Sequence, residues 1–322
     1  MKIEEACKTW LLDEYGKFAI SRQALLSKFL RMWLDKKYKD EKLTNILDSK
    51  KALRVFERFC KVLLRDRKIR AQKWATKGFR YITINSKPGE NIEKILSATY
   101  PIGYIGYISA IKHYNLIQNK SNSIYFVTVD REAWKRTCLK NIYDTFPELK
   151  RNKDLFQELF EDIYVEDLIP TYPVEETIDF SQVVIVNQKR LSPNEEWNNV
   201  RVETLPHLYI DILRNPKYCG GLGQVLQIYT SIDHKVFEEV IEILDKDSRS
   251  TNIDKARFGF IFEKILQIEN NIFLKWKEEQ MFKRGGTRKL VSYLPFESTY
   301  DEDWNISVNY DLAKPYASSS SM

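Results

Sequence analysis

The sequence is poor in the residues that build disulfide frameworks, zinc sites and membrane spans. Only four cysteines occur in 322 residues, Cys7, Cys60, Cys138 and Cys219, and no two of them form a CxxC pair. Cysteines so far apart predict reduced core residues and no disulfide framework. No apolar run approaches the roughly 20 residues that span a bilayer. The N-terminus, MKIEEACKTW, also lacks the basic-then-apolar order of a signal peptide, so we expect a cytoplasmic protein that makes no membrane contact.

Histidine and the common enzyme motifs are equally sparse. The three histidines, His113, His207 and His234, are scattered, and the sequence contains no HExxH, P-loop or GxSxG motif. His113 lies in a near-apolar stretch, which favours a core or rim residue over a metal ligand. Residues 301–303 (Asp-Glu-Asp) could hold a divalent cation on a loop, but without a second carboxylate cluster we interpret them as solvated surface. The sequence therefore predicts no enzyme activity, no catalytic residue, no metal and no cofactor.

Charge is distributed unevenly along a chain of ordinary globular composition. Hydrophobic residues make up 43% and charged residues 30%, and 322 residues suggest two domains. The net charge is only +6, yet residues 1–86 hold 22 Lys and Arg against 10 Asp and Glu, and the remainder holds 29 against 35. A small basic domain joined to a larger acidic one is typical of a nucleic-acid reader tethered to a second function.

The stretch 50–68 predicts a helix with one basic and one apolar side. Asp48 or Ser49 can cap its first turn. Its cations follow one another at steps of three, four, three and four, which places them on one face: Lys51, Arg54, Arg58, Lys61 and Arg65. The opposite face is expected to consist of Leu53, Phe56, Phe59, Cys60, Val62 and Leu63. The alternative is a surface helix whose solvated face happens to be basic.

A basic hairpin follows this helix. Residues 69–75 and 79–84 predict two strands around a turn with Gly78, and the hairpin carries Lys73, Lys77 and Arg80. Two helices precede the basic one, at 3–15 and after a cap at Ser21, and a polar, extended connection spans 35–48. Three helices followed by a basic hairpin predict an N-terminal winged helix-turn-helix over residues 1–86, with the helix in the major groove and the hairpin on the DNA backbone.

A linker at residues 85–91 (NSKPGEN) separates this domain from a larger, mostly helical α+β domain over 87–322. A near-apolar helix is expected around 105–111, strands at 124–129, 179–191 and 200–204, and mainly helices after residue 204. The chain as a whole is thus predicted to be α+β.

Two glycine clusters in this second domain are candidate anion sites. Residues 219–223 (CGGLG) precede a helix, but no Lys-Ser/Thr pair follows, so we favour a tight turn between helices. Residues 284–289 (RGGTRK) place Arg284, Arg288 and Lys289 around Gly285 and Gly286. This cluster could hold a phosphate of a nucleic acid or nucleotide, or acidic residues of its own domain.

Taken together, these residues resemble the AbiEi family of type IV antitoxins over most of the chain and in the family's order. The resemblance lies in residues 49–84; in 104–110 (YIGYISA) with 114–116 (YNL); in 202–204 (VET) with 209–214 (YIDILR), Pro216, Cys219, Gly220, Gly221 and 257–260 (RFGF); and in 284–290 (RGGTRKL) with 304–309 (WNISVN).

The resemblance implies a winged-helix repressor that binds double-stranded DNA at its own operon, joined to an antitoxin domain. The toxin in such pairs is a nucleotidyltransferase-like protein encoded beside the antitoxin and opposed without a stable complex. Winged-helix repressors often bind inverted repeats as pairs, so a homodimer on DNA is compatible with this role. Two alternatives stay open: a nucleic-acid-processing enzyme with its site near residues 284–289, and a protein-binding component of a phage-defence assembly with Gly285, Gly286 and Trp304 at an interface.

Overall fold

The structure is a computed structural model that describes residues 1–44, 46, 51–74, 78–85, 92–117, 122–150, 154–161, 163–178, 180–281 and 288–312. It is a mixed α+β fold, which confirms the predicted class. Its contacts divide the chain into two compact units, and the division differs from the predicted boundary after residue 86. The first unit comprises Met1–Ile105, Asn122–Leu191 and Glu196–Arg201, and the second comprises Gly106–Ser121, Ser192–Glu195 and Val202–Met322.

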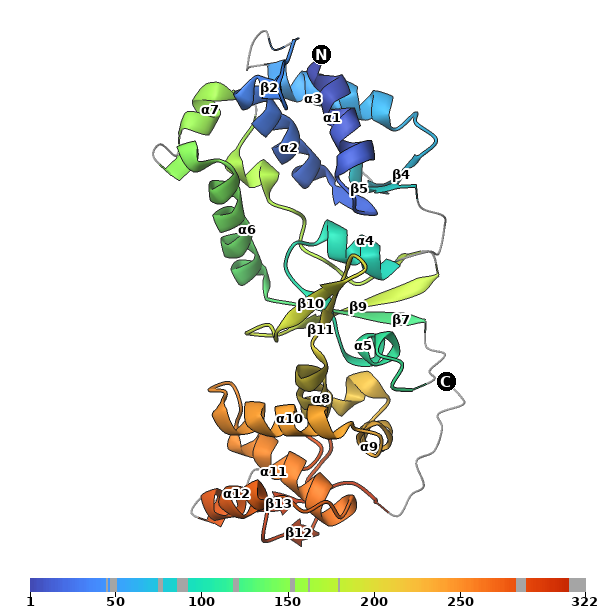
Figure 1. The fold of residues 1–322 in the computed structure, drawn as a ribbon, viewed down its shortest axis with the longest axis vertical. Helices are drawn as coiled ribbons and strands as arrows, with labels where there is room; N and C mark the ends of the chain where they lie inside the picture. The colour runs from blue at the N-terminus through green and yellow to red at the C-terminus, as the bar shows by residue number, and fades with distance from the viewer. Residues whose placement is uncertain are drawn as a thin grey trace. The chain divides into compact units, whose positions relative to one another are not determined.

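The N-terminal part of the first unit contains three main helices and a three-stranded antiparallel sheet with strand order β1-β5-β4 (Figure 1). The predicted cap at Ser21 is confirmed, since its side chain accepts a hydrogen bond of 3.1 Å from the backbone N–H of Ala24. The elements are α1 (Ile3–Thr9), a π-helical turn (Trp10–Glu14), β1 (Ala19–Ser21), α2 (Arg22–Asp35), β2 (Lys37–Tyr38), β3 (Glu41–Lys42), α3 (Ala52–Leu63), β4 (Ile69–Trp74) and β5 (Gly78–Ile84).

An extended connection was predicted before α3, at residues 35–48, but the structure there is not extended throughout. Its first part folds into the short β2–β3 hairpin, in which Lys37 lies opposite Lys42. The backbone can reverse there because Lys36 and Lys39 both adopt positive φ angles of 53°. The predicted caps of α3, Asp48 and Ser49, lie outside the described residues.

The rest of the first unit contains helices and most of a six-stranded sheet with strand order β10-β11-β6-β7-β9-β8. Strands β7 and β9 are parallel, with Ser123 opposite Gln182 and Thr128 opposite Asn187. Parallel neighbours need a long crossover, and here it contains α6 (Arg131–Thr145) and several short helical turns. The strands are β6 (Tyr104–Ile105), β7 (Ser123–Thr128), β8 (Glu176–Ile178), β9 (Ser181–Asn187), β10 (Asn194–Trp197) and β11 (Val200–Glu203).

Aromatic side chains fill the core beside this sheet. The ring of Tyr100 lies 5.7 Å from that of Phe126 and 6.2 Å from that of Trp134, measured between centroids. Trp134 is completely buried on α6, and its indole N–H donates a 3.0 Å hydrogen bond to the carbonyl of Pro170. Helix α4 (Ile92–Thr99) adds Leu96 to the same cluster. The crossover helix is therefore fixed to the sheet by apolar burial and one satisfied polar group.

The second unit is mainly helical, as predicted. Phe258 and Phe262 stack with centroids 4.2 Å apart at its centre. The predicted tight turn at the first glycine cluster is confirmed, because Gly220 and Gly221 have φ angles of 80° and 95° that favour glycine. The elements are α5 (Tyr107–His113), α8 (Leu205–Arg214), α9 (Leu222–Tyr229), α10 (His234–Lys246), α11 (Asn252–Phe260) with a π-helical end (Ile261–Ile265), α12 (Asn271–Met281), β12 (Tyr300–Asp301) and β13 (Ile306–Ser307).

All four cysteines are buried and unbridged, which confirms the prediction of core residues. Burial raises the pKa of the Cys60 and Cys138 thiols to about 12. In the part of the chain that the structure describes, no helix has the length and apolar character needed to cross a bilayer.

Candidate nucleic-acid interface

Helix α3 presents a row of cations on its exposed side, as the spacing predicted. The side chains of Arg54, Arg58, Lys61 and Arg65 are all exposed. Steps of four, three and four residues keep them near one line along the helix, with Arg65 just beyond the last helical residue. Over the seven residues from Arg54 to Lys61 the helical rise extends this row about 10 Å, and Arg65 follows after the end of the helix.

The opposite side of α3 anchors the helix in the core. Phe56 and Phe59 both contact the ring of Phe29 on α2, with centroid distances of 5.4 and 6.0 Å. Arg22 of α2 pairs with Glu57 of α3, and its guanidinium lies 5.4 Å from the centre of the Phe56 ring. The buried residues of the helix are Ala52, Val55, Phe56, Phe59, Cys60 and Leu63. The cation row is therefore carried by a helix held firmly in place.

The cations of this row are not neutralised by nearby acids. Among the described residues, Arg54, Arg58, Lys61 and Arg65 have no carboxylate within ion-pair distance. The nearest acids along the chain are already engaged: Glu57 pairs with Arg22, and Asp66 pairs with Lys8 at 2.8 Å. The Lys8 ammonium holds the pKa of Asp66 below its usual range. Lys51 is exposed at the start of the row but already takes part in an interaction of its own.

More cations follow where the chain leaves α3 and enters β4. Arg67, Lys68 and Arg70 are exposed, and they were not among the predicted contact residues. Their signal was available, since they continue the basic run directly after Arg65. At the hairpin tip, Lys77 and the side chain of Lys73 lie outside the described residues.

Arg80 does not belong to this surface, so its predicted contact with the DNA backbone is corrected. It is buried on β5, where its Nη1 group donates to both carboxylate oxygens of Glu176 on β8, at 2.9 and 3.0 Å. Its guanidinium lies 5.3 Å from the centre of the Tyr100 ring. A buried arginine paired inside its own unit cannot also bind a phosphate.

The prediction that Val62 faces the core is also wrong. Val62 is 55% exposed, whereas Val55, which was not predicted, is buried. Val62 lies four residues after Arg58, so helical periodicity places it near the cation row rather than opposite it. Apolar side chains are therefore exposed beside the cations as well, since Leu64, directly after the end of α3, is also 40% exposed.

Only part of the second predicted contact cluster, residues 284–289, lies among the described residues. Arg284, Gly285 and Gly286 lie outside the described residues. Arg288 is buried and its Nη1 group donates to the side-chain oxygen of Gln280, while the half-buried Lys289 donates a 2.6 Å hydrogen bond to the carbonyl of Leu294.

Trp304 is fully buried, and its indole N–H donates a 2.9 Å hydrogen bond to Glu263. The expectation that Arg288 and Trp304 meet a partner at the surface is therefore corrected, because both side chains are taken up by the interior of the second unit. The acids at 301–303 are also used locally: Asp301 accepts a 2.8 Å hydrogen bond from the backbone of Trp304, and Asp303 pairs with Lys264 at 2.5 Å.

A buried polar cluster in the second unit was not foreseen from the sequence. Arg214 bridges two buried acids: its guanidinium is 3.1 Å from Asp211 and 2.9 Å from Asp254. Glu203 is completely buried beside Asp211, and burial together with the Asp211 carboxylate raises its pKa well above the usual range. Ser192 donates a 3.1 Å hydrogen bond to Asp211. Periodicity in the sequence does not predict a buried acid of this kind, because the partners of the acid come from distant segments.

No protein-family model, curated protein or solved structure matches the chain.

Proposed function

We propose that the protein is a winged helix-turn-helix regulator that reads duplex DNA with α3. This proposal rests on the row of exposed cations Arg54, Arg58, Lys61 and Arg65, which have no carboxylate partner among the described residues. The order of elements supports it: three helices precede the β4–β5 hairpin, and β1 completes a sheet of order β1-β5-β4 beside them. This is the arrangement in which the third helix enters a groove and the hairpin lies on the backbone.

The dimensions and chemistry of α3 suit a major groove. A helix with its side chains is about 10–12 Å across, and the groove is about 12 Å wide. Arginine in a groove donates to guanine O6 and N7 or to phosphates, and lysine serves as a point charge on phosphates. In this proposal Arg67, Lys68 and Arg70 meet the flanking backbone, together with Lys73 and Lys77 of the hairpin. Exposed Val62 and Leu64 border the cations and can contact thymine methyl groups.

The antitoxin part of the proposal depends on the AbiEi resemblance. In it, the protein represses its own operon and opposes a nucleotidyltransferase-like toxin encoded beside it. In the second unit, the resembling segment 257–260 contacts Lys289 and Trp304 of the resembling segments near the C-terminus. Arg257 donates a 2.8 Å hydrogen bond to the carbonyl of Lys289, and a side chain at Gly259 would meet the ring of Trp304. These contacts give the shared residues a role in packing, which supports a common fold for the segments.

DNA binding is tested with the double variant Arg58→Ala, Lys61→Ala and a duplex from upstream of the gene. Fluorescence anisotropy should show a loss of at least about tenfold in affinity. The matched control is Lys189→Ala, Arg190→Ala, which removes one lysine and one arginine from an exposed loop of the same unit and should change affinity less than about twofold. Equal losses in the two variants would show that only net charge matters, and α3 would then not be the reading helix.

The antitoxin role is tested by expressing the neighbouring gene alone and together with this chain. Growth arrest by the neighbour and its relief by the full chain are the expected results. Relief that persists in Arg58→Ala, Lys61→Ala would separate the antitoxin role from DNA binding. A harmless neighbouring gene would remove the antitoxin role and leave the DNA-binding proposal standing.

A further inference from the structure

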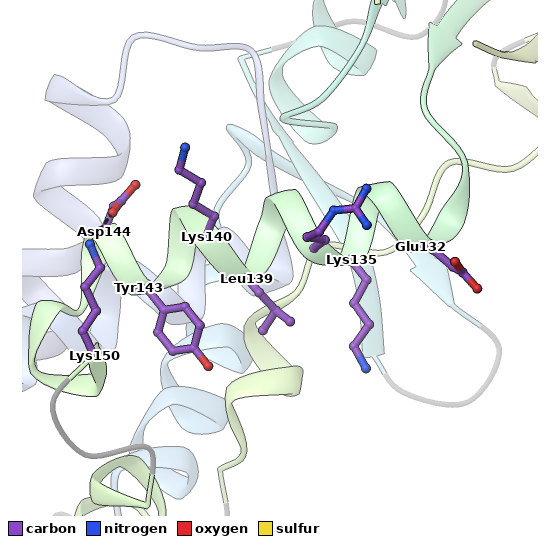
Figure 2. Close-up of a pocket in the computed structure, with 8 residues that line it drawn as sticks. Glu132, Lys135, Leu139, Lys140, Tyr143, Asp144 and Lys150 are labelled. Atoms are coloured by element: carbon purple, nitrogen blue, oxygen red, sulfur yellow. Dashed lines mark hydrogen bonds and ion pairs between the residues drawn. The ribbon is translucent and has the colours of Figure 1, made fainter. Parts of the chain in front are cut away.

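The outward face of α6 carries a second basic surface, which the proposed DNA-reading role does not use (Figure 2). A shallow hollow of about 550 Å³ runs along this helix and ends at Lys150 in the helical turn that follows. Lys135, Leu139, Lys140 and Tyr143 of α6 line it. Tyr143 and Leu139 are half-buried, whereas the lysines are exposed.

Apolar groups occupy the centre of this hollow and cations border it. Leu139 and Tyr143 are four residues apart, so they lie one above the other on the helix surface. Helical periodicity places Lys135 on one side of that pair and Arg136 and Lys140 on the other. Figure 2 shows Lys135, Leu139 and Tyr143 projecting from one side of the helix and Lys140 from the other.

The bordering cations are available to a partner. Among the residues that the structure describes, Lys135, Arg136 and Lys140 have no carboxylate within ion-pair distance, while Lys150 pairs with Asp144 at 2.7 Å. Glu132 lies at the N-terminal end of the hollow, where the helix dipole favours an acid. The remaining surface is therefore positive on both sides of an apolar strip.

The arrangement differs from that of α3 in a way that indicates a different partner. On α3 the cations form the central row and the exposed apolar side chains border it. On α6 the apolar side chains are central and the surface is hollowed, so it receives a protruding ligand rather than entering a groove. A phosphate backbone offers nothing apolar for Leu139 and Tyr143 to bury. An amphipathic helix with acids beside its apolar strip complements both features.

We propose that the α6 surface docks an acidic amphipathic helix of a protein partner. Apolar side chains of the partner, spaced one helical turn apart, pack on Leu139 and Tyr143. Its flanking Asp and Glu side chains pair with Lys135 on one side and with Arg136 and Lys140 on the other. The contact is small and partly ionic, so the interaction is transient and weakens as salt is added.

Selection from a library of displayed 16-residue peptides tests this inference, with the full-length chain as bait. The counter-selection bait is Lys135→Glu, Lys140→Glu. We expect enriched peptides with apolar residues at i and i+4 flanked by acids. Their affinity should fall about tenfold or more in the counter-selection variant and also in Leu139→Ala, Tyr143→Ala. The control variant Lys189→Glu, Arg190→Glu, with the same change in charge, should bind them as the wild type does.

Two results would overturn the inference. One is the absence of any peptide that prefers the wild type over the Lys135→Glu, Lys140→Glu variant. The other is a loss of duplex DNA affinity in that variant without a loss of peptide affinity, which would make α6 a second nucleic-acid surface. Thermal unfolding of each variant identifies any that fail to fold. The charge reversals involve exposed side chains only, so they decide the question even if Leu139→Ala, Tyr143→Ala is unstable.

Discussion

Arg80 and Glu176 form a buried ion pair that joins two parts of the first unit. The Nη1 group of Arg80 lies 2.9 Å from the nearer carboxylate oxygen, and the two side chains are only 6% and 18% exposed. Arg80 belongs to β5 in the N-terminal sheet, and Glu176 belongs to β8 at the edge of the six-stranded sheet. Tyr100 adds its ring over Arg80 and a 3.4 Å hydrogen bond to Glu176. This contact joins residues on both sides of position 86 within the first unit.

Removing one member of this pair should destabilise the first unit strongly. Arg80→Ala leaves the Glu176 carboxylate buried without its partner, at an expected cost of about 3–5 kcal/mol. The double variant Arg80→Ala, Glu176→Ala should lose less than the sum of the two single variants, because no charge is left alone. Urea unfolding followed by tryptophan fluorescence measures both. A loss of DNA affinity in Arg80→Ala without a loss of stability would contradict this role and indicate that Arg80 contacts DNA.

Helical periodicity made the α3 face predictable, and the absence of such a rule explains the error at Arg80. The steps between Arg54, Arg58, Lys61 and Arg65 define one side of a helix whatever lies around it. On β5 the alternation rule fails, because Phe79, Arg80 and Tyr81 are all buried and both faces of the strand are covered. The partner that neutralises Arg80 lies 96 residues away. No local pattern contains that information.

Val62 and Val55 provide a direct test of which side of α3 is buried. Val62 is 55% exposed and Val55 is 9% exposed. Val62→Ala should therefore change the free energy of unfolding by no more than about 0.5 kcal/mol. Val55→Ala removes two buried methyl groups and should cost about 1–3 kcal/mol. Chemical denaturation of the two variants side by side provides the measurement, and a larger loss for Val62→Ala would contradict the orientation of the helix.

The salt dependence of DNA binding should report how many α3 cations meet phosphates. Each phosphate contact contributes a slope of about −0.9 to a plot of log affinity against log salt. If Arg58 and Lys61 both contact phosphates, the Arg58→Ala, Lys61→Ala variant should have a slope shallower by about 1.8. Anisotropy titrations from about 50 to 200 mM salt give the slope. An unchanged slope with reduced affinity would instead indicate contacts to base edges.

Gly259 and Trp304 should show how tightly the second unit is packed. An added Cβ at Gly259, on α11, would come within 2.0 Å of the Trp304 ring. Alanine normally stabilises a helix relative to glycine by about 1 kcal/mol, yet here the collision should dominate. Gly259→Ala is expected to lose about 2 kcal/mol or more. Trp304→Phe should lower the free energy of unfolding less in the Gly259→Ala background than in the wild type. Equal losses in the two backgrounds would show that the two residues do not collide.

Glu203 should make the stability of the second unit depend on pH in a defined direction. Burial, followed by the Asp211 carboxylate, raises its pKa in the folded chain well above the value of about 4.3 in the unfolded chain. Below that unfolded value Glu203 is protonated in both states. As the pH rises above it, the unfolded chain releases the proton and the folded chain does not. Stability should therefore fall as the pH rises towards the folded pKa, by at most about 1.4 kcal/mol per pH unit from this group.

Glu203→Gln removes this loss, because glutamine cannot ionise and its amide can still donate to Asp211. The variant should be more stable than the wild type at pH 8, and the difference should shrink or reverse near pH 5.

Glu269→Gln, which changes an exposed glutamate of the same unit, should leave the pH profile as it is. Urea midpoints between pH 5 and pH 8 provide the comparison. Arg214 is shared between Asp211 and Asp254, and its charge offsets only part of the rise in the pKa of Glu203. Parallel profiles for the wild type and the Glu203→Gln variant would mean that Glu203 is ionised in the folded chain, which would contradict its raised pKa.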